Sequence, residues 1–425
     1  MLALSMGCGG LPPDNEEAEE LGVAESELSA GCAVLKSKND PVLWSGTVGP
    51  EDGPVGGEPP ECREVNCDHF RLRLNVPRGT FQNPNRPGGL EIGIRWPNAN
   101  NTLNLFVYKG NTLVAKSAGI IATAQAVFVP EPSNGDYVIW IAADPTYNLD
   151  PSVPYDAFAE IEFKPKTTPL RQVLPDLQFR APRNARFATP SMPIFEPDPP
   201  PGSTCFTTES VEDGARLCLR FDQVIANVGE GPLEVREAIP KDPSNTALNA
   251  FQRIYSTDGS FVQRPAGDFE FHEEHQHYHY KSFAVSALWA SDSTGKKLGT
   301  TPVRSTRKVS FCIADIEMNR FGQPGIGPRT YFAPDCLFPQ ASDDNFDYLI
   351  VGMTNGWTDV YDWFLPGQYV EVTGVSDGFY LLESCADPDS KLVETAENNN
   401  CIDTLIRLSN MTAPMPNVET LRTLP

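Results

Sequence analysis

The sequence is poor in basic residues and in histidine, has no Cys-x-x-Cys pair and contains no long apolar run. Its 33 lysines and arginines face 56 aspartates and glutamates, which gives a formal net charge of −23 at pH 7. That balance excludes a nucleic-acid partner, because binding to phosphates requires a basic face. No apolar stretch approaches the roughly 18 residues of a membrane-spanning helix, so no transmembrane helix is expected.

The 10 cysteines match no zinc ribbon, because no two of them form a Cys-x-x-Cys pair. Disulfides in an oxidising compartment are the better interpretation, and they predict an extracytoplasmic protein. The sequence alone does not determine which cysteines pair with each other. Proximity in the sequence favours three pairs, Cys205–Cys218, Cys312–Cys336 and Cys385–Cys401.

Turn-forming residues are abundant, with 40 prolines and 33 glycines. Clusters of them recur at short intervals, which predicts short strands joined by many turns rather than long helices. We therefore expect an all-β protein. A chain of 425 residues is long enough for two domains, each with its own core.

The chain begins with residues 1–8, which end in Ser-Met-Gly-Cys and resemble the lipobox of a bacterial lipoprotein. This resemblance predicts a lipid on Cys8 and a secreted or cell-surface protein whose membrane contact is that anchor alone. The apolar part is shorter than an ordinary signal peptide and has no basic residues, so an accidental likeness is the alternative. The acidic residues that follow predict a solvated tether, which completes a first segment at 1–31.

Residues 32–165 are expected to form an accessory β-sandwich, followed by a linker at 166–172. The run Gly135–Trp140 resembles the last strand of bacterial pre-peptidase C-terminal domains, which are accessory modules of secreted enzymes. Gly110-Asn111 is expected at the tip of a hairpin. His69 stands alone here, and a lone histidine is more often structural. Six strands are predicted: Phe70–Val76, Gly89–Trp96, Thr102–Tyr108, Thr112–Ala118, Ala126–Val129 and Tyr137–Ala143.

The second domain is predicted at 173–425, again from strands alone. Alternating apolar and polar positions, or runs of β-forming residues, indicate its strands. Five are predicted: Leu217–Ile225, Val285–Trp289, Val309–Ile313, Tyr369–Val375 and Phe379–Cys385.

Four of the 5 histidines lie in the single stretch 268–280, at His272, His275, His277 and His279. The last three are spaced i, i+2, i+4, so on a β-strand their side chains share one face, about 7 Å apart from one to the next. Neutral imidazoles in this arrangement suit copper or zinc. His272 is out of phase, and its role as a fourth ligand, a group behind the ligands or a structural residue stays open. An adventitious surface site is the alternative.

The histidine stretch resembles the copper-binding motif of the lysyl oxidase family, Trp-x-Trp-His-x-x-His-x-His-x-His, with Phe269 and Phe271 in place of the tryptophans. Two further segments are similar to those that carry the family's cofactor residues. One is Arg-Lys-Val-Ser-Phe-Cys-Ile-Ala-Asp, which contains Lys308, and the other is Gly-Met-Thr-Asn-Gly-Trp-Thr-Asp-Val-Tyr, which ends at Tyr361.

Two further motifs resemble the beginning and the end of the family's catalytic domain. Leu174–Leu177, Leu-Pro-Asp-Leu, is similar to the beginning of the family's catalytic domain, and Glu394–Cys401 is similar to its end. The resemblance therefore covers about residues 173–410, with its motifs in the family's order. It implies a β-rich copper domain with disulfides behind the accessory sandwich.

The resemblance implies a copper-dependent amine oxidase with a lysine tyrosylquinone cofactor made from Lys308 and Tyr361. Such an enzyme converts a primary amine, either peptidyl lysine or a small amine, to an aldehyde, consuming O2 and releasing ammonia and hydrogen peroxide. Asp359 would share a strand face with Tyr361 and is a candidate base. The rival hypothesis is a non-catalytic copper-binding or adhesive surface lipoprotein that keeps the fold. The presence of Lys308 and Tyr361 favours the enzyme, because a mere copper binder needs neither.

Some lysyl oxidases also bind calcium through the two ends of the catalytic domain. The matching positions here all offer oxygen, as a hard cation requires. They are Asp176, Leu177 through its carbonyl, Glu394, Asn399 and Asn400. Ala396 stands where the family often has an aspartate, and the loss of that charge weakens the expectation of calcium. Clusters of asparagine are also ordinary loop formers.

Overall fold

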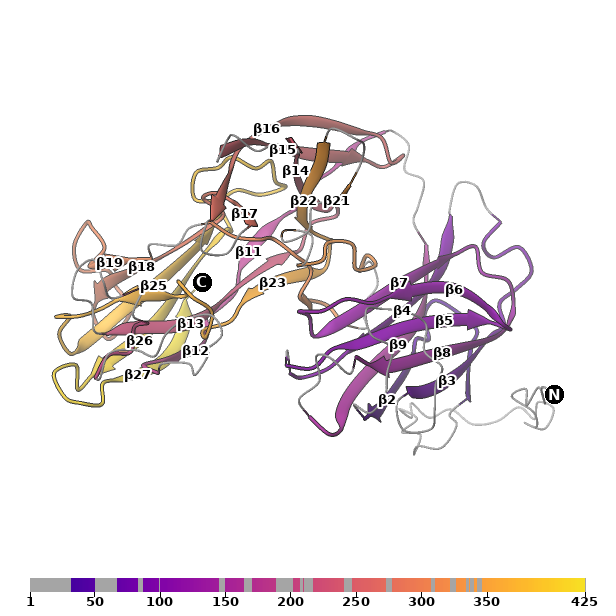
Figure 1. Ribbon diagram of the computed structural model, residues 1–425, viewed down its shortest axis with the longest axis horizontal. Helices are drawn as coiled ribbons and strands as arrows, with labels where there is room; N and C mark the ends of the chain where they lie inside the picture. The colour runs from indigo at the N-terminus through magenta and orange to yellow at the C-terminus, as the bar shows by residue number, and fades with distance from the viewer. Residues whose placement is uncertain are drawn as a thin grey trace. The chain divides into compact units, whose positions relative to one another are not determined.

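A computed structural model of the chain is almost entirely β-structure and divides into two compact units (Figure 1). Unit 1 comprises Met1–Arg171 with Ile316–Phe332, and unit 2 comprises Gln172–Asp315 with Ala333–Pro425. No helix among the described residues is long and apolar enough to cross a membrane. The structure describes residues 32–49, 67–82, 87–98, 100–144, 150–163, 170–188, 202–206, 209, 217–240, 247–272, 277–306, 310–321, 326–333, 336, 340–341 and 346–424.

Unit 1 is built on two packed sheets, as the sequence predicts. One sheet has the order β1-β3-β8-β5-β6 and the other β2-β9-β4-β7. Inward-facing apolar side chains of both sheets, from Leu35 to Ile161, form one continuous core. The strands are β1 (Cys32–Leu35), β2 (Val42–Val48), β3 (Cys67–Leu74), β4 (Gly88–Arg95), β5 (Leu103–Lys109), β6 (Thr112–Ser117), β7 (Ala124–Pro130), β8 (Gly135–Ala143) and β9 (Val153–Phe163).

All six strands predicted for this unit are present, within a few residues of their expected bounds. The hairpin between β5 and β6 turns at Gly110, whose φ of 58° is left-handed and costs glycine no strain. Partial desolvation lowers the pKa of His69, whose ring meets Trp140 edge-on although the residue as a whole is exposed.

Residues 316–332 leave unit 2 and pack in unit 1, which the sequence does not reveal. The carbonyl of Ile316 accepts the N–H of Thr123 at 2.9 Å. The buried guanidinium of Arg329 donates to Gln125 and to the carbonyls of residues 119–121. The ring of Phe321 meets Phe158 edge-on. These contacts hold the segment in unit 1, although in the sequence it lies between the two parts of unit 2.

Unit 2 contains three sheets. The first has the order β17-β16-β15-β14-β22-β21, with β10 beside β15; the second contains β11-β13-β23, with β12 and β24 also on β13; the third has the order β19-β18-β25-β26-β27. The strands are β10 (Gln172–Val173), β11 (Leu177–Phe179), β12 (Arg183–Arg186), β13 (Cys218–Asn227), β14 (Leu233–Pro240), β15 (Ala247–Ser256), β16 (Phe261–His272), β17 (His277–Tyr280), β18 (Ala284–Ser291), β19 (Arg304–Ser305), β21 (Gln340–Ala341), β22 (Phe346–Met353), β23 (Trp357–Tyr361), β24 (Tyr369–Glu371), β25 (Gly378–Ala386), β26 (Cys401–Ser409) and β27 (Asn417–Leu424).

The second and third sheets of unit 2 pack face to face over an apolar core. Leu219 and Phe221 of β13 contribute from one side, and Leu288, Leu382 and Ile406 contribute from the other. Disulfides join the cysteine pairs that sequence proximity favours, namely Cys205–Cys218, Cys312–Cys336 and Cys385–Cys401. Such bonds fit an oxidising, extracytoplasmic compartment.

The prediction of a strand at Val309–Ile313 is wrong. Within its described part, the only ladder contact is an isolated bridge between Phe311 and Tyr280. The reason lies in the next residue. The backbone N–H and C=O of Cys312 both bond to the hydroxyl of Tyr361, so these groups are not available for pairing with a neighbouring strand.

Candidate functional site

Two of the clustered histidines lie on the short strand β17. Their Nε2 atoms are 2.7 Å apart, and their rings meet at 4.6 Å between centroids. His279 is buried, with 2% of its surface exposed. The alternation of a strand directs both side chains to one face, as the spacing predicts. Two imidazole nitrogens that converge in this way form the kind of nitrogen pair that copper or zinc accepts.

The other members of the predicted site are less fully described. The backbone of His272 pairs with that of His277 in the ladder between β16 and β17, but its side chain lies outside the described set. His275, Lys308 and Cys8 also fall outside the described residues. Their predicted roles therefore stay predictions.

A continuous chain of contacts leads from β17 to Tyr361. Tyr280, the residue after His279, exchanges backbone hydrogen bonds with Phe311 at 2.8 and 3.0 Å. The next residue, Cys312, donates its N–H to the Tyr361 oxygen at 2.6 Å and accepts the Tyr361 hydroxyl at 3.0 Å. The ring of Phe311 also packs edge-on against Tyr361, at 4.7 Å between centroids. The histidine strand and this tyrosine are therefore linked through two consecutive residues.

Tyr361 lies at the end of β23 with its hydroxyl in the interior. Burial, and then the negative charge of Asp359, raise the pKa of the phenol well above its usual range. Asp359 is itself 2% exposed, and it shares the strand face of Tyr361 because it is two residues away. The phenol is accordingly neutral at physiological pH, and a carboxylate lies on its face of the sheet.

Side chains of β13 fix the loop that follows Tyr361. The guanidinium of Arg220 donates to the carbonyls of Trp363 and Leu365, at 3.2 and 3.3 Å, and pairs with Glu209. The N–H of Trp363 donates to Asp222 at 2.8 Å. Since Arg220 is fully buried, its charge is balanced by these partners rather than by water. The position of Tyr361 is thus constrained on both sides.

A second polar cluster joins the two ends of the expected domain. The N–H of Leu177 donates to the carboxylate of Glu394, and the amide of Asn400 donates to the same carboxylate at 2.8 Å. The amide of Asn399 donates to Asp176 at 2.8 Å. The five residues expected to bind calcium therefore form two hydrogen-bonded groups, Leu177–Glu394–Asn400 and Asp176–Asn399, and Leu177 contributes its N–H rather than its carbonyl.

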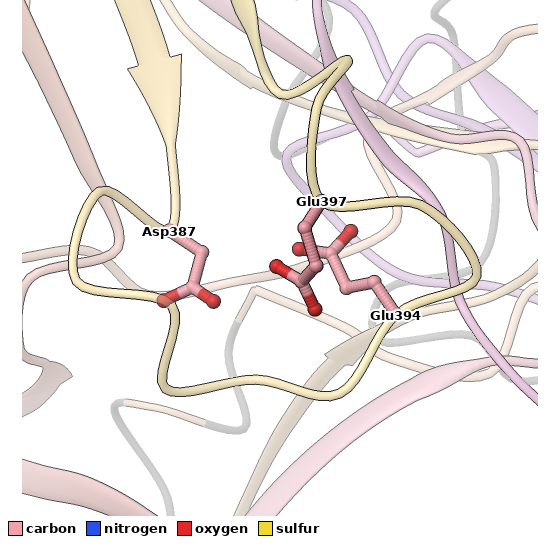
Figure 2. A group of neighbouring side chains, drawn as sticks. All are labelled: Asp387, Glu394 and Glu397. Atoms are coloured by element: carbon pink, nitrogen blue, oxygen red, sulfur yellow. The ribbon is translucent and has the colours of Figure 1, made fainter.

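Two carboxylates that sequence reasoning missed complete this cluster, Asp387 and Glu397. Together with Glu394 they offer oxygens that all lie within 4.8 Å of one another, and Figure 2 shows them around one loop. Burial, with repulsion from Asp387 and Glu397, raises the pKa of Glu394 to about 8. Burial also raises the pKa of Asp387. The available sequence signal was the presence of acidic residues on both sides of Glu394.

The all-β fold and this geometry define a disulfide-bonded protein with a histidine strand linked to a partly buried tyrosine. Residues 247–418 match the family model of the lysyl oxidases. Human lysyl oxidase homolog 1 is 23% identical over 200 residues, which are 47% of this chain and 26% of that protein. Lysyl oxidase homolog 3A of Danio rerio is 29% identical over 131 residues, 31% of this chain and 15% of that protein. The match thus spans only a fraction of each relative.

Among solved structures, the pre-peptidase C-terminal domain of a collagenase from Bacillus anthracis aligns over 32% of this chain and 100% of that domain, at 7% identity and a TM-score of 0.20. The periplasmic lysozyme inhibitor PliG of Aeromonas hydrophila aligns over 31% of this chain and 98% of that protein, at 10% identity and a TM-score of 0.19. Likeness at this level supports no functional conclusion.

Proposed function

We propose that this protein is a copper-dependent amine oxidase that converts primary amines to aldehydes, with a lysine tyrosylquinone formed from Lys308 and Tyr361. The observation that carries the proposal is the contact chain from His279 through Tyr280, Phe311 and Cys312 to Tyr361. Lys308 lies three residues before Phe311 in the same segment. A protein that only stores or senses copper has no need of a partly buried tyrosine anchored beside its metal strand.

The donor set fits copper. His277 and His279 offer imidazole nitrogens that converge, and His275 continues their spacing of two residues in the sequence. Borderline nitrogen donors of this kind favour copper or zinc over the hard cations. Bound copper would supply the one-electron chemistry that activates O2 toward a nearby phenol. The three histidines would hold it, and His272, at the end of the neighbouring strand β16, would be a fourth ligand or a group behind the ligands.

The chain's own residues prepare Tyr361 for oxidation. The backbone of Cys312 holds the hydroxyl from two sides, which fixes the ring in one orientation. Because the pKa of the phenol is raised, its proton must pass to a base when the ring is oxidised. Asp359 lies on the same face and is the carboxylate we assign to that proton. Lys308 would provide the amine, which is nucleophilic only when its pKa is depressed by desolvation or a nearby cation.

The test is to load the purified full-length protein with copper in air and to follow its visible absorption. We expect a quinone band that phenylhydrazine removes, together with equal amounts of peroxide and ammonia when a primary amine is added. A small amine and a lysine-containing protein should be compared, because the site does not choose between them. Copper binding without a band, or without peroxide from either amine, would instead support the copper-binding surface protein.

We also propose that Asp176, Leu177, Glu394, Asn399 and Asn400 bind calcium, joined by Asp387 and Glu397. The side-chain oxygens of both asparagines are buried without a hydrogen-bond partner, while their amide nitrogens contact carboxylates. If the side-chain amide of either asparagine were rotated by half a turn, its oxygen would face the carboxylates. Such an arrangement of oxygens is favourable only when a cation lies between them. Asp387 and Glu397 also restore the negative charge that is missing at Ala396.

Calcium is expected to stabilise the protein by joining the two ends of the domain. At a calcium concentration 100 times the dissociation constant, the gain is about 2.7 kcal/mol, or roughly 5–10 °C in Tm for a unit of this size. Thermal unfolding in calcium, in magnesium and in a chelator measures it. Glu394→Gln should abolish the shift, whereas Glu383→Gln, a change to a half-buried carboxylate that pairs with Lys297, should keep it. A shift that survives Glu394→Gln, or that magnesium reproduces, would contradict this site.

A further inference from the structure

Two buried glutamines of unit 2 have side chains without any hydrogen-bond partner. Gln223 is 2% exposed and Gln368 is fully buried, yet the oxygen and the nitrogen of each carboxamide are unpaired. A buried amide that gains no hydrogen bond costs free energy, and native proteins keep few of them. Such groups therefore indicate a partner that arrives after the chain has folded.

Gln223 lies directly across from Tyr361. The two residues are paired in the antiparallel ladder between β13 and β23. Side chains that are directly opposite on such a ladder point to the same face, with Cβ atoms about 5 Å apart. Asp359, which is opposite Ile225, lies on this face too. The carboxamide of Gln223 is thus the nearest cross-strand neighbour of the tyrosine ring.

Gln223 also borders the apolar core between the second and third sheets of unit 2. Leu219 and Phe221 of β13 pack with Val370 in that core. Gln223 continues the same row of β13, two residues after Phe221. Its carboxamide consequently lies at the polar end of an otherwise apolar core.

The hydrogen bonds of the Tyr361 hydroxyl do not account for this amide, since Cys312 supplies both of the contacts recorded for it. A carboxamide offers two N–H donors and a carbonyl acceptor. Oxidation of the ring to a quinone adds an oxygen acceptor, and the N–H donors of an adjacent amide match it. An apolar residue of equal size would fill the same space without this complementarity.

We propose that Gln223 is a positioning residue that holds the oxidised ring of Tyr361 by donating to its added oxygen. The inference rests on the proposed function, because it requires that a quinone forms. It assigns to β13 a part in the site that the histidine, lysine and tyrosine motifs do not reveal. It also explains why a polar group was kept in a core position that favours an apolar residue.

The test compares Gln223→Met and Gln223→Leu with the wild type in the full-length chain. The metal-free variants should unfold at the wild-type temperature or above it, because an unpaired amide has been removed. Copper content should be unchanged. Quinone formed per copper should fall at least about tenfold, or its absorption maximum should move, and kcat should fall while KM for the amine is retained. Ser291→Ala is the matched control, since its buried hydroxyl is also unpaired but lies at the far end of β18.

Each outcome decides between the possibilities. A wild-type band and yield in both variants would overturn the inference while leaving the proposed function intact. A lower unfolding temperature in both metal-free variants would show that the amide serves ordinary packing, and would also overturn it. If one variant fails to fold, the other carries the same comparison. A wild-type protein that forms no quinone would reject the proposed function itself, and this inference with it.

Discussion

A Tyr361→Phe protein is expected to bind copper normally, to form no quinone and to lose amine turnover by at least about 1,000-fold. The substitution removes the hydroxyl that Cys312 holds but keeps the ring and its packing against Phe311. Metal analysis, visible spectroscopy and a peroxide assay measure the three quantities. Lys308→Ala should likewise abolish turnover, but it should still permit oxidation of the tyrosine, because only the adding amine is lost.

Tyr380→Phe is the matched control for this prediction. Tyr380 is also buried, and its hydroxyl also donates to a backbone carbonyl, that of Ser376 at 2.8 Å. Its loss should change stability and leave the quinone intact. Peptide mapping of aerated, copper-loaded wild type should join the peptides that contain Lys308 and Tyr361. Finding the two peptides only as separate species would refute the lysine-derived cofactor.

Replacing His275, His277 or His279 with alanine is expected to weaken copper binding by more than about 100-fold. Even residues behind the ligands change metal affinity 10- to 100-fold, so loss of a direct ligand should cost more. Copper content after dialysis against a weak chelator measures the effect. Each variant should also lack the quinone, because oxidation of Tyr361 depends on the metal.

His69→Ala provides the control, since this histidine belongs to β3 of unit 1, whereas the predicted copper ligands belong to unit 2. It should retain full copper and a full quinone band. Retention of copper by the triple variant of His275, His277 and His279 would reject the site. Such a result would also direct attention to histidine-independent metal binding elsewhere in the chain.

Local patterns predicted much of the fold. Strand alternation and turn residues identified the sandwich strands of unit 1, and sequence proximity identified three disulfides. Both rest on interactions between residues that are near in the chain. Local patterns did not predict that the segment 316–332 belongs to unit 1. Its place there depends on partners about 200 residues away, such as Gln125 for Arg329. Nothing local records such a partner.

The sequence by itself determined an all-β chain with a histidine strand and, through resemblance to lysyl oxidases, named Tyr361 and Lys308. Only the tertiary structure decided how Tyr361 is held. The strand expected at Val309–Ile313 does not form, since Cys312 uses its backbone groups on the Tyr361 hydroxyl. Likewise, Gln223 became a neighbour of Tyr361 only through a ladder between strands 138 residues apart in sequence. Hydrogen bonds across such separations depend on the register of the folded sheets, and residue spacing along one chain does not encode that register.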